Sequence, residues 1–121
     1  MKVGDYVRTK YGEITKIKDI WENERIFFEN IIVLGYTTSD NIYASQKEKY
    51  IIKSSPNIID LIEVGDYING FKVYEIKNGQ LRTISYYDGY ICYLCSDYEI
   101  KSIVTKQQFK NMEYKVGDNN E

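Results

Sequence analysis

Two dipeptides in the C-terminal half, Asn78-Gly79 and Asp88-Gly89, constrain the fold of this chain more than any other feature. Each is a strong signal for a two-residue β-hairpin, because a type I′ turn needs positive φ at both central residues. Composition points the same way, since there are 13 Tyr and Ala44 is the only alanine, a bias that favours strands over helices. The predicted strands of this meander are residues 71–77, 80–87, 90–96 and 98–104.

The two turns also predict the register of the meander. The expected pairs are Glu75 with Arg82, Val73 with Ile84, Ile84 with Tyr93, and Tyr86 with Ile91. This register gives the sheet two apolar faces, and both need a cover. One predicted face carries Phe71, Val73, Ile84, Tyr86, Ile91 and Tyr93, and the other carries Tyr74, Ile76, Leu81 and Leu94. We therefore expect a homo-oligomer built on this sheet, with residues 35–49 or the C-terminal helix as the alternative cover.

A short motif recurs along the chain. Val3-Gly4-Asp5-Tyr6-Val7 returns as Val64-Gly65-Asp66-Tyr67-Ile68, and residues 114–118 repeat it in part. Gly and Asp favour a turn and the residues that follow favour a strand, so each copy predicts a strand entry. A duplicated module and a common strand opener used twice both explain the repeat.

The N-terminal half predicts a first group of strands. We expect strands over residues 6–9, 13–20, 26–34 and 50–52, with a bulge or twist in the second, a hairpin loop over 21–25 and a mobile excursion over 35–49. Ser55-Pro56 suits the start of a helical turn over residues 55–62, with Ser55 as N-cap. Thr105 and Gln108 match a capping box that opens a short helix through Met112.

These elements predict a mostly β fold with minor α content, made of two small SH3-like or meander modules packed together. The expected divisions are an N-terminal β module over 1–54, a helical-turn connector over 55–63, a β-meander module over 64–104, and a short helix and tail over 105–121.

The sequence offers little to a catalytic mechanism. Histidine is absent, which removes the commonest general base and metal ligand and excludes Ser–His and Cys–His nucleophile pairs. Cys92 and Cys95 fall three residues apart in a predicted strand, where their side chains point to opposite faces. We interpret them as packing residues that form neither a disulfide nor a metal site, and we expect no enzyme activity and no cofactor.

Four residues are candidates for binding: Arg8, Trp21, Arg25 and Arg82. Arginine suits phosphate or carboxylate recognition, and aromatic rings stack on bases and other flat groups. Trp21 and Arg25 flank the tip of a predicted hairpin, where an exposed Trp is typical of a contact residue. The alternative is that Trp21 folds into the interior of the module.

Charge and hydropathy limit the partners only loosely. The net charge is −2 and the pI is about 5.3, whereas a nucleic-acid-binding domain usually carries a basic stripe. The start of the chain does not resemble a signal peptide, and no apolar run reaches the roughly 18 residues that span a bilayer. We therefore expect a cytoplasmic protein with no membrane partner.

Residues 4–8 with 12–17 resemble the opening of KOW and other SH3-like barrel modules. Three longer segments, residues 3–9, 55–67 and 102–109, resemble small uncharacterised proteins from phages and prophages of low-GC Gram-positive bacteria. The second resemblance implies a non-enzymatic protein that inhibits or sequesters a host component by occupancy, as anti-CRISPR proteins do, in the host cytoplasm. Its target would be a host protein or a small signalling nucleotide. The alternative is an accessory module for nucleic acid, which the charge favours less.

Overall fold

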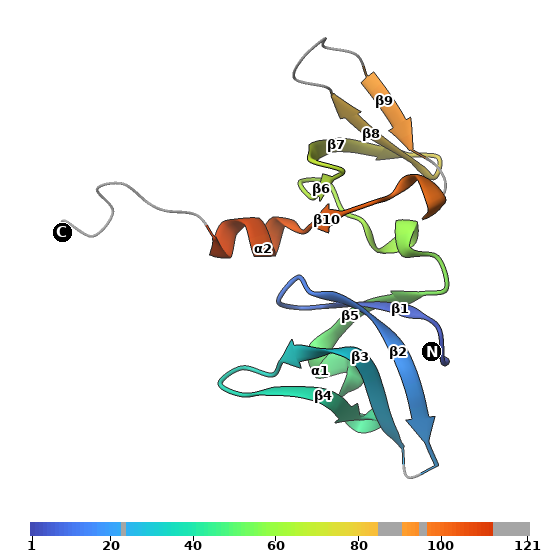
Figure 1. Ribbon diagram of the computed structural model, residues 1–121, viewed down its shortest axis with the longest axis vertical. Coiled ribbons are helices and arrows are strands. Elements are labelled where there is room, and N and C mark those ends of the chain that lie inside the picture. The colour runs from blue at the N-terminus through green and yellow to red at the C-terminus, as the bar shows by residue number, and fades with distance from the viewer. Residues whose placement is uncertain (23, 85–90, 95–96, 113–121) are drawn as a thin grey trace, which may run out of the picture.

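The computed structural model describes residues 1–22, 24–84, 91–94 and 97–112. Its strands form two antiparallel sheets in separate lobes, arranged along the long axis of the molecule, and α2 lies between them (Figure 1). The helices are short and strands outnumber helices more than twofold in residues, which confirms the predicted mostly β fold with minor α content.

The first lobe contains a sheet with the strand order β4-β3-β2-β1-β5. The 3₁₀ turn η1 (Ala44–Gln46) and the one-turn helix α1 (Lys47–Tyr50) connect its last two strands. The strands of this lobe are β1 (Tyr6–Thr9), β2 (Ile14–Trp21), β3 (Arg25–Val33), β4 (Thr38–Tyr43) and β5 (Ile51–Ser55).

The core of this lobe comes from inward residues of the strands and from Tyr50 of α1. Its buried side chains are Val7, Ile17, Ile26, Phe28, Ile32, Ile42 and Tyr50. The pairing of β2 with β3 shifts register between Ile17 and Asp19, which confirms the predicted bulge. The expectation of a mobile excursion over residues 35–49 is wrong, because β4 pairs with β3 and buries Ile42 to 2% exposure. Apart from Tyr43, the other residues of β4 besides Ile42 are Thr, Ser, Asp and Asn, so the segment has the composition of a loop.

The second lobe repeats the order of the first, as β9-β8-β7-β6-β10. Residues 98–104 do not form the predicted single strand: the 3₁₀ turn η3 (Asp97–Glu99) comes first, and only Ile103–Val104 pairs, as β10. The other strands of this lobe are β6 (Tyr67–Ile68), β7 (Phe71–Lys77), β8 (Gln80–Ile84) and β9 (Ile91–Leu94).

The hairpin at Asn78-Gly79 forms as predicted, with φ of 53° and 77° at the two residues. Glu75 pairs with Arg82 as expected, and their side chains form a 3.0 Å salt bridge. Beyond that point a register shift in β7 places Val73 opposite Thr83 instead of Ile84. The expected pair of Ile84 with Tyr93 is also wrong, because Ile84 pairs with Ile91. Asp88-Gly89 and Tyr86 lie outside the described residues.

The bulge in β7 changes which residues share a face. Val73 and Leu81, which we expected on opposite faces, belong to one buried cluster with Ile62 and Ile68. Ile14 of the first lobe also packs against this cluster, so the two lobes share apolar contacts. The predicted division of the apolar residues between two faces, which motivated the expected oligomer, is therefore wrong.

The two Gly-Asp segments make equivalent hydrogen bonds. Gly4 N donates to Ile17 O at 2.9 Å and Ile17 N donates to Asp5 O at 2.8 Å; Gly65, Val73 and Asp66 repeat the pattern at 2.9 and 2.8 Å. Each Asp carboxylate also accepts the N–H three residues before it, at 3.0 Å for Asp5 and 2.7 Å for Asp66. The shared strand order and shared turn support the interpretation as a duplicated module; the third copy lies outside the described residues.

The connector between the lobes contains a single 3₁₀ turn, η2 (Ile58–Leu61). Ser55 is not its N-cap, since it still belongs to β5 and η2 begins three residues later. The first N–H groups of η2 find their acceptor in Asp97 of the second lobe. The Asp97 carboxylate accepts hydrogen bonds from the N–H groups of Ile58 and Ile59 at 2.9 and 3.1 Å. The helix α2 (Lys106–Asn111) begins with the predicted capping box of Thr105 and Gln108.

A buried ion pair holds the lobes together. Arg8 lies on β1 and has no exposed surface. Its Nη1 lies 2.5 Å from Asp66 Oδ2 and its Nη2 2.9 Å from Asp66 Oδ1, and the same two nitrogens donate to Leu61 O and Gln107 Oε1 at 3.0 and 2.7 Å. A bidentate arginine–carboxylate pair fixes orientation as well as distance. The relative placement of the lobes is therefore set by a buried network in addition to the connector.

The β1–β2 turn and the start of α2 meet at the edge of this junction. Thr105 Oγ1 donates to Gly12 O at 2.7 Å, and Lys106 N donates to Asp66 Oδ1 at 2.9 Å. Gly12 has φ of +87°, and a Cβ at that position would lie 2.5 Å from Thr105 Oγ1 and from Gln107 Cβ. This contact between the two lobes therefore requires glycine.

Glu63 lies between two lysines at the rim of the same junction. Its carboxylate is 2.9 Å from Lys106 Nζ and 3.3 Å from Lys53 Nζ. Partial burial by itself raises the pKa of Glu63, but the hydrogen bond from Lys106 and the charges of Arg8 and Lys53 outweigh it and hold the pKa below its usual 4.5. The charged form of Glu63 therefore stabilises the folded chain.

Candidate functional site

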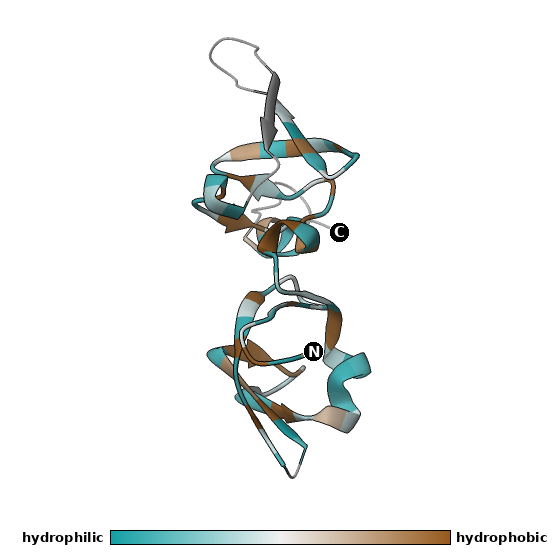
Figure 2. Ribbon diagram, turned by 90° about the vertical axis from the view of Figure 1, so that its right-hand side faces the viewer, coloured by the Kyte–Doolittle hydropathy of each residue, from teal (hydrophilic) through white to brown (hydrophobic). Residues whose placement is uncertain are grey.

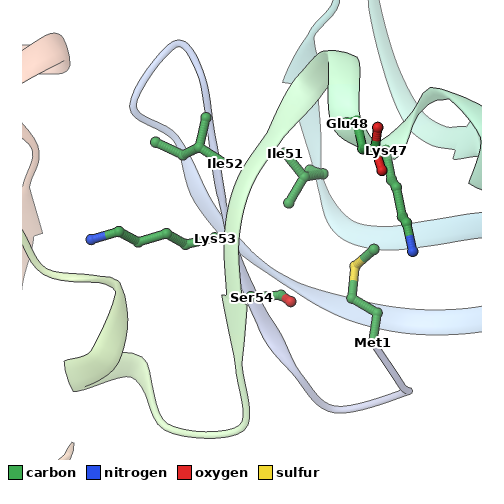
Figure 3. Close-up of a pocket in the computed structure, with 7 residues that line it drawn as sticks. All are labelled: Met1, Lys47, Glu48, Ile51, Ile52, Lys53 and Ser54. Carbon is green, nitrogen blue, oxygen red and sulfur yellow. The ribbon is translucent and has the colours of Figure 1, made fainter.

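One hollow of about 210 Å³ lies against β5 and α1 in the first lobe. Figure 3 shows that the Lys53 side chain extends away from Met1, Lys47 and Ile51, so the lining side chains do not converge on one point. Lys53 is also engaged by Glu63 at 3.3 Å. This hollow brings together no set of groups that would recognise a particular ligand.

A better candidate lies on the outer face of β2, β3 and β4. The register aligns Trp21, Arg25 and Tyr43 as one cross-strand row. The neighbouring row on the same face is Asp19, Phe27 and Asn41. We call these six residues the aromatic face. Alternation along β3 and β4 explains their position, because Ile26 and Ile42, which lie between them in sequence, are buried in the core.

Contacts within the aromatic face fix its side chains. Trp21 Nε1 donates to Asp19 Oδ2 at 3.1 Å, and the Trp21 ring packs against Phe27 at 4.5 Å between centroids. Arg25 Nη1 donates to Asn41 Oδ1 at 2.7 Å and its Nη2 donates to the Tyr43 hydroxyl. The Arg25 guanidinium carbon lies 4.2 Å from the centroid of the Tyr43 ring. A partner would meet side chains that are already ordered, which lowers the entropy lost on binding.

The two largest rings of the face remain accessible. Trp21 is 51% exposed and Tyr43 is 47% exposed. Ordered, exposed Trp and Tyr are the residues that most often dominate binding interfaces, because each buries a large area and also offers a hydrogen-bond donor. Trp21 therefore does not fold into the interior of the lobe.

Carboxylates outnumber cations among the exposed residues on this face and next to it in sequence. The exposed carboxylates on and beside the aromatic face are Asp19, Glu22, Glu24 and Asp40, against Lys18 and Arg25. Arg25 donates to the neutral groups of Asn41 and Tyr43 and keeps its positive charge, so four carboxylates stand against two cations. The local charge thus attracts cations and repels phosphate groups.

The structure separates the four predicted binding residues. Trp21 and Arg25 lie together on the aromatic face, as the hairpin tip predicted. Arg8 is completely buried in the ion pair with Asp66, so it presents no surface to a ligand. Arg82 lies on β8 in the other lobe, beside Glu75. The four residues therefore do not form one site.

Sequence reasoning missed the rest of the aromatic face. Phe27 was assigned to a central strand, and Tyr43 and Asn41 to a mobile excursion. The available signal was the two-residue spacing of Asp19 with Trp21, Arg25 with Phe27, and Asn41 with Tyr43. That signal becomes informative only when β4 is recognised as a strand.

No metal-binding group appears in the described part of the chain, where no three His, Cys, Asp or Glu residues gather closely enough to hold an ion. Cys95 lies outside the described residues, so the prediction of two unpaired packing cysteines stays a prediction.

None of the known family models matches the chain, and neither a curated protein nor a solved structure shows significant similarity to it. Among the residues that the structure describes, no helix has the length and hydrophobicity needed to cross a bilayer.

Proposed function

We propose that this chain is a non-enzymatic binding protein that uses its aromatic face to hold a basic segment of a partner protein. The observation that carries the proposal is the half-exposed Trp21 ring, which is fixed by the Asp19 carboxylate and by Phe27, with the exposed Glu22 and Glu24 close to it in sequence. A Lys or Arg of the partner would stack on this ring as a cation–π contact and pair with the nearby carboxylates.

The charge distribution favours a protein partner over nucleic acid. A nucleic-acid surface also uses aromatic stacking, but it needs cations to neutralise phosphates. Here the exposed groups around Trp21 are mainly Asp19, Glu22, Glu24 and Asp40, and Arg25 is engaged within the face. Small signalling nucleotides meet the same electrostatic obstacle.

The resemblances found in the sequence complete the proposal. In it, both lobes are SH3-like modules, a class in which aromatic surfaces dock extended peptides. The partner is a host-cell protein in the cytoplasm, and the chain acts as a phage-type inhibitor by covering a basic surface of that protein. Occupancy requires no catalytic group, in keeping with a sequence that lacks histidine.

The experiment uses Trp21, which is the only tryptophan and therefore reports directly on the site. Its fluorescence is followed during titration with a short Lys/Arg-rich peptide, and separately with an acidic peptide of equal length and a single-stranded oligothymidylate. We expect the basic peptide alone to shift and quench the emission, and the effect to weaken between about 50 mM and 500 mM salt, because these contacts are screened.

Two exposed tyrosines of the same lobe make a matched pair of variants. Tyr43→Ala removes a ring of the aromatic face, whereas Tyr36→Ala removes a fully exposed ring that lies away from it. We expect Tyr43→Ala to weaken peptide binding about tenfold and Tyr36→Ala to leave it unchanged. A response to the oligothymidylate that exceeds the response to the basic peptide would contradict the proposal and favour the nucleic-acid alternative.

A further inference from the structure

A second accessible apolar surface lies on the other lobe, between β6, β10 and α2. It is a groove of about 400 Å³ lined by Tyr67, Gly70, Val104, Phe109 and Met112. The rings of Tyr67 and Phe109 stack at 4.7 Å between centroids, and this stack forms one wall. Phe109 is 49% exposed and Met112 is 81% exposed, so the groove presents large apolar groups to solvent.

Positive charge borders this groove. Lys72 is the cross-strand partner of Tyr67, and Lys110 follows Phe109 on α2; both are exposed. Lys106 is held by Glu63 at 2.9 Å and contributes less. None of the described residues that line the groove is acidic. The groove therefore suits an apolar anchor with acidic neighbours.

The same molecule carries such an anchor. At the tip of the β2–β3 hairpin, Trp21 is half-exposed and Glu22 and Glu24 lie beside it, both exposed. We propose that the hairpin tip of one copy docks in the groove of a second copy, with Trp21 against Phe109 and Met112 and the two glutamates facing Lys72 and Lys110. This inference rests on the proposed function, since it names a second copy of this chain as one basic partner of the aromatic face.

The arrangement of the lobes makes the contact intermolecular. Figures 1 and 2 both place the β2–β3 tip at the far end of the first lobe, whereas α2 lies between the lobes. A copy cannot reach its own groove with its own tip. The contact joins two different surfaces, so an open assembly keeps one free tip and one free groove at its two ends unless a ring closes.

Sedimentation of the full chain at micromolar to high-micromolar concentration tests this inference. Such concentrations are needed because one hairpin tip in one groove makes a small interface, and small interfaces are weak. We expect the wild-type chain to exceed its 14.3 kDa monomer mass as concentration rises. Trp21→Ser removes the apolar anchor of the tip, and Met112→Glu places a charged side chain in the groove. Each variant alone should remain a monomer. Both positions are surface residues, and circular dichroism checks that each variant is folded.

An equimolar mixture of the two variants gives the decisive result. Met112→Glu keeps an intact tip and Trp21→Ser keeps an intact groove, so the mixture should form a dimer that cannot extend further. Tyr36→Ala serves as the control and should associate like the wild type. A wild-type chain that stays monomeric at every concentration, or a mixture that fails to dimerise, would overturn the inference.

The two proposals fail separately. If the basic peptide binds Trp21 while the wild type remains monomeric, the self-association is wrong and the proposed function stands. If the wild type associates and the variant mixture dimerises while the peptide produces no change in fluorescence, the tip-to-groove contact stands and recognition of foreign basic segments is wrong. The basic peptide should also compete with self-association, because both use the same face.

Discussion

Replacing Asp66 with Asn exchanges one carboxylate oxygen for an NH₂ group. This substitution should lower the free energy of unfolding more than any other exchange of similar size at the lobe junction. The Asp66 carboxylate is fully buried and accepts four hydrogen bonds, two from Arg8 and one each from the N–H groups of Glu63 and Lys106. Asn keeps only one acceptor oxygen, so part of this donor set would face an NH₂ group. The buried Arg8 guanidinium would keep only the more distant carboxylate of Glu63 as a counter-charge, 3.6 Å from its Nη2. Breaking a buried pair in this way costs about 3–5 kcal/mol.

The duplicated turn provides a matched control in the same chain. Asp5 occupies the equivalent position, is 6% exposed, and in the described part of the chain its carboxylate accepts only the Lys2 N–H, at 3.0 Å. No arginine depends on Asp5, so Asp5→Asn should cost only about 1 kcal/mol, the net value of one hydrogen bond. The difference between the two losses of unfolding free energy separates the contribution of the buried ion pair from that of the turn.

Urea denaturation followed by circular dichroism measures both variants. The free energy of unfolding comes from linear extrapolation, and unchanged slopes would show that the comparison concerns the folded state. We expect Asp66→Asn to lose at least about 2 kcal/mol more than Asp5→Asn. Equal losses of unfolding free energy would mean that the Arg8–Asp66 pair adds nothing to the coupling of the lobes. That result would refute a stabilising role for the buried pair.

Three further predictions concern the same junction. Gly12→Ala should lower the free energy of unfolding by more than about 2 kcal/mol, because the new Cβ would lie 2.5 Å from Gln107 Cβ and the backbone φ is +87°. Gly79 also has positive φ but open space around it, so Gly79→Ala should cost about half as much in the same urea assay. Glu63 has a lowered pKa in the folded chain, so its contribution to stability is present above the unfolded value near 4.5 and is lost as pH falls through the folded value. Glu63→Gln should therefore flatten the fall in unfolding free energy below about pH 4.5, and an unchanged pH profile would contradict this. Asp97→Ala should cost about 1 kcal/mol in thermal or urea unfolding, because it removes the acceptor for two N–H groups of η2.

Local signals in the sequence predicted local structure well. Asn78-Gly79 predicted both the hairpin and the pair of Glu75 with Arg82, and Thr105 with Gln108 predicted the start of α2. The register failed beyond the bulge in β7, since a turn fixes pairing only as far as the first inserted residue. The strand β4 was missed because its exposed, polar residues outnumber its single buried one, Ile42.

The candidate site was predictable only in part, for a different reason. Trp21 and Arg25 belong to one hairpin, so their proximity follows from the sequence near the turn. Tyr43 and Asn41 join them through the pairing of β3 with β4, a contact between segments that no local rule specifies. Arg8 looks like a surface residue on β1, and only the packing of the second lobe places Asp66 against it. Nothing in the local sequence distinguishes this buried arginine from an exposed one.

The central claim is that the aromatic face recognises a basic segment of a protein. The most direct test is a ¹H–¹⁵N NMR titration of the full chain with the Lys/Arg-rich peptide, in which the single Trp21 indole N–H gives one side-chain signal. We expect the largest shifts at this indole signal and at the backbone amides of β2, β3 and β4 around Trp21, Arg25 and Tyr43. Shifts centred on any other surface, or an indole signal that stays in place while the peptide binds, would contradict this claim.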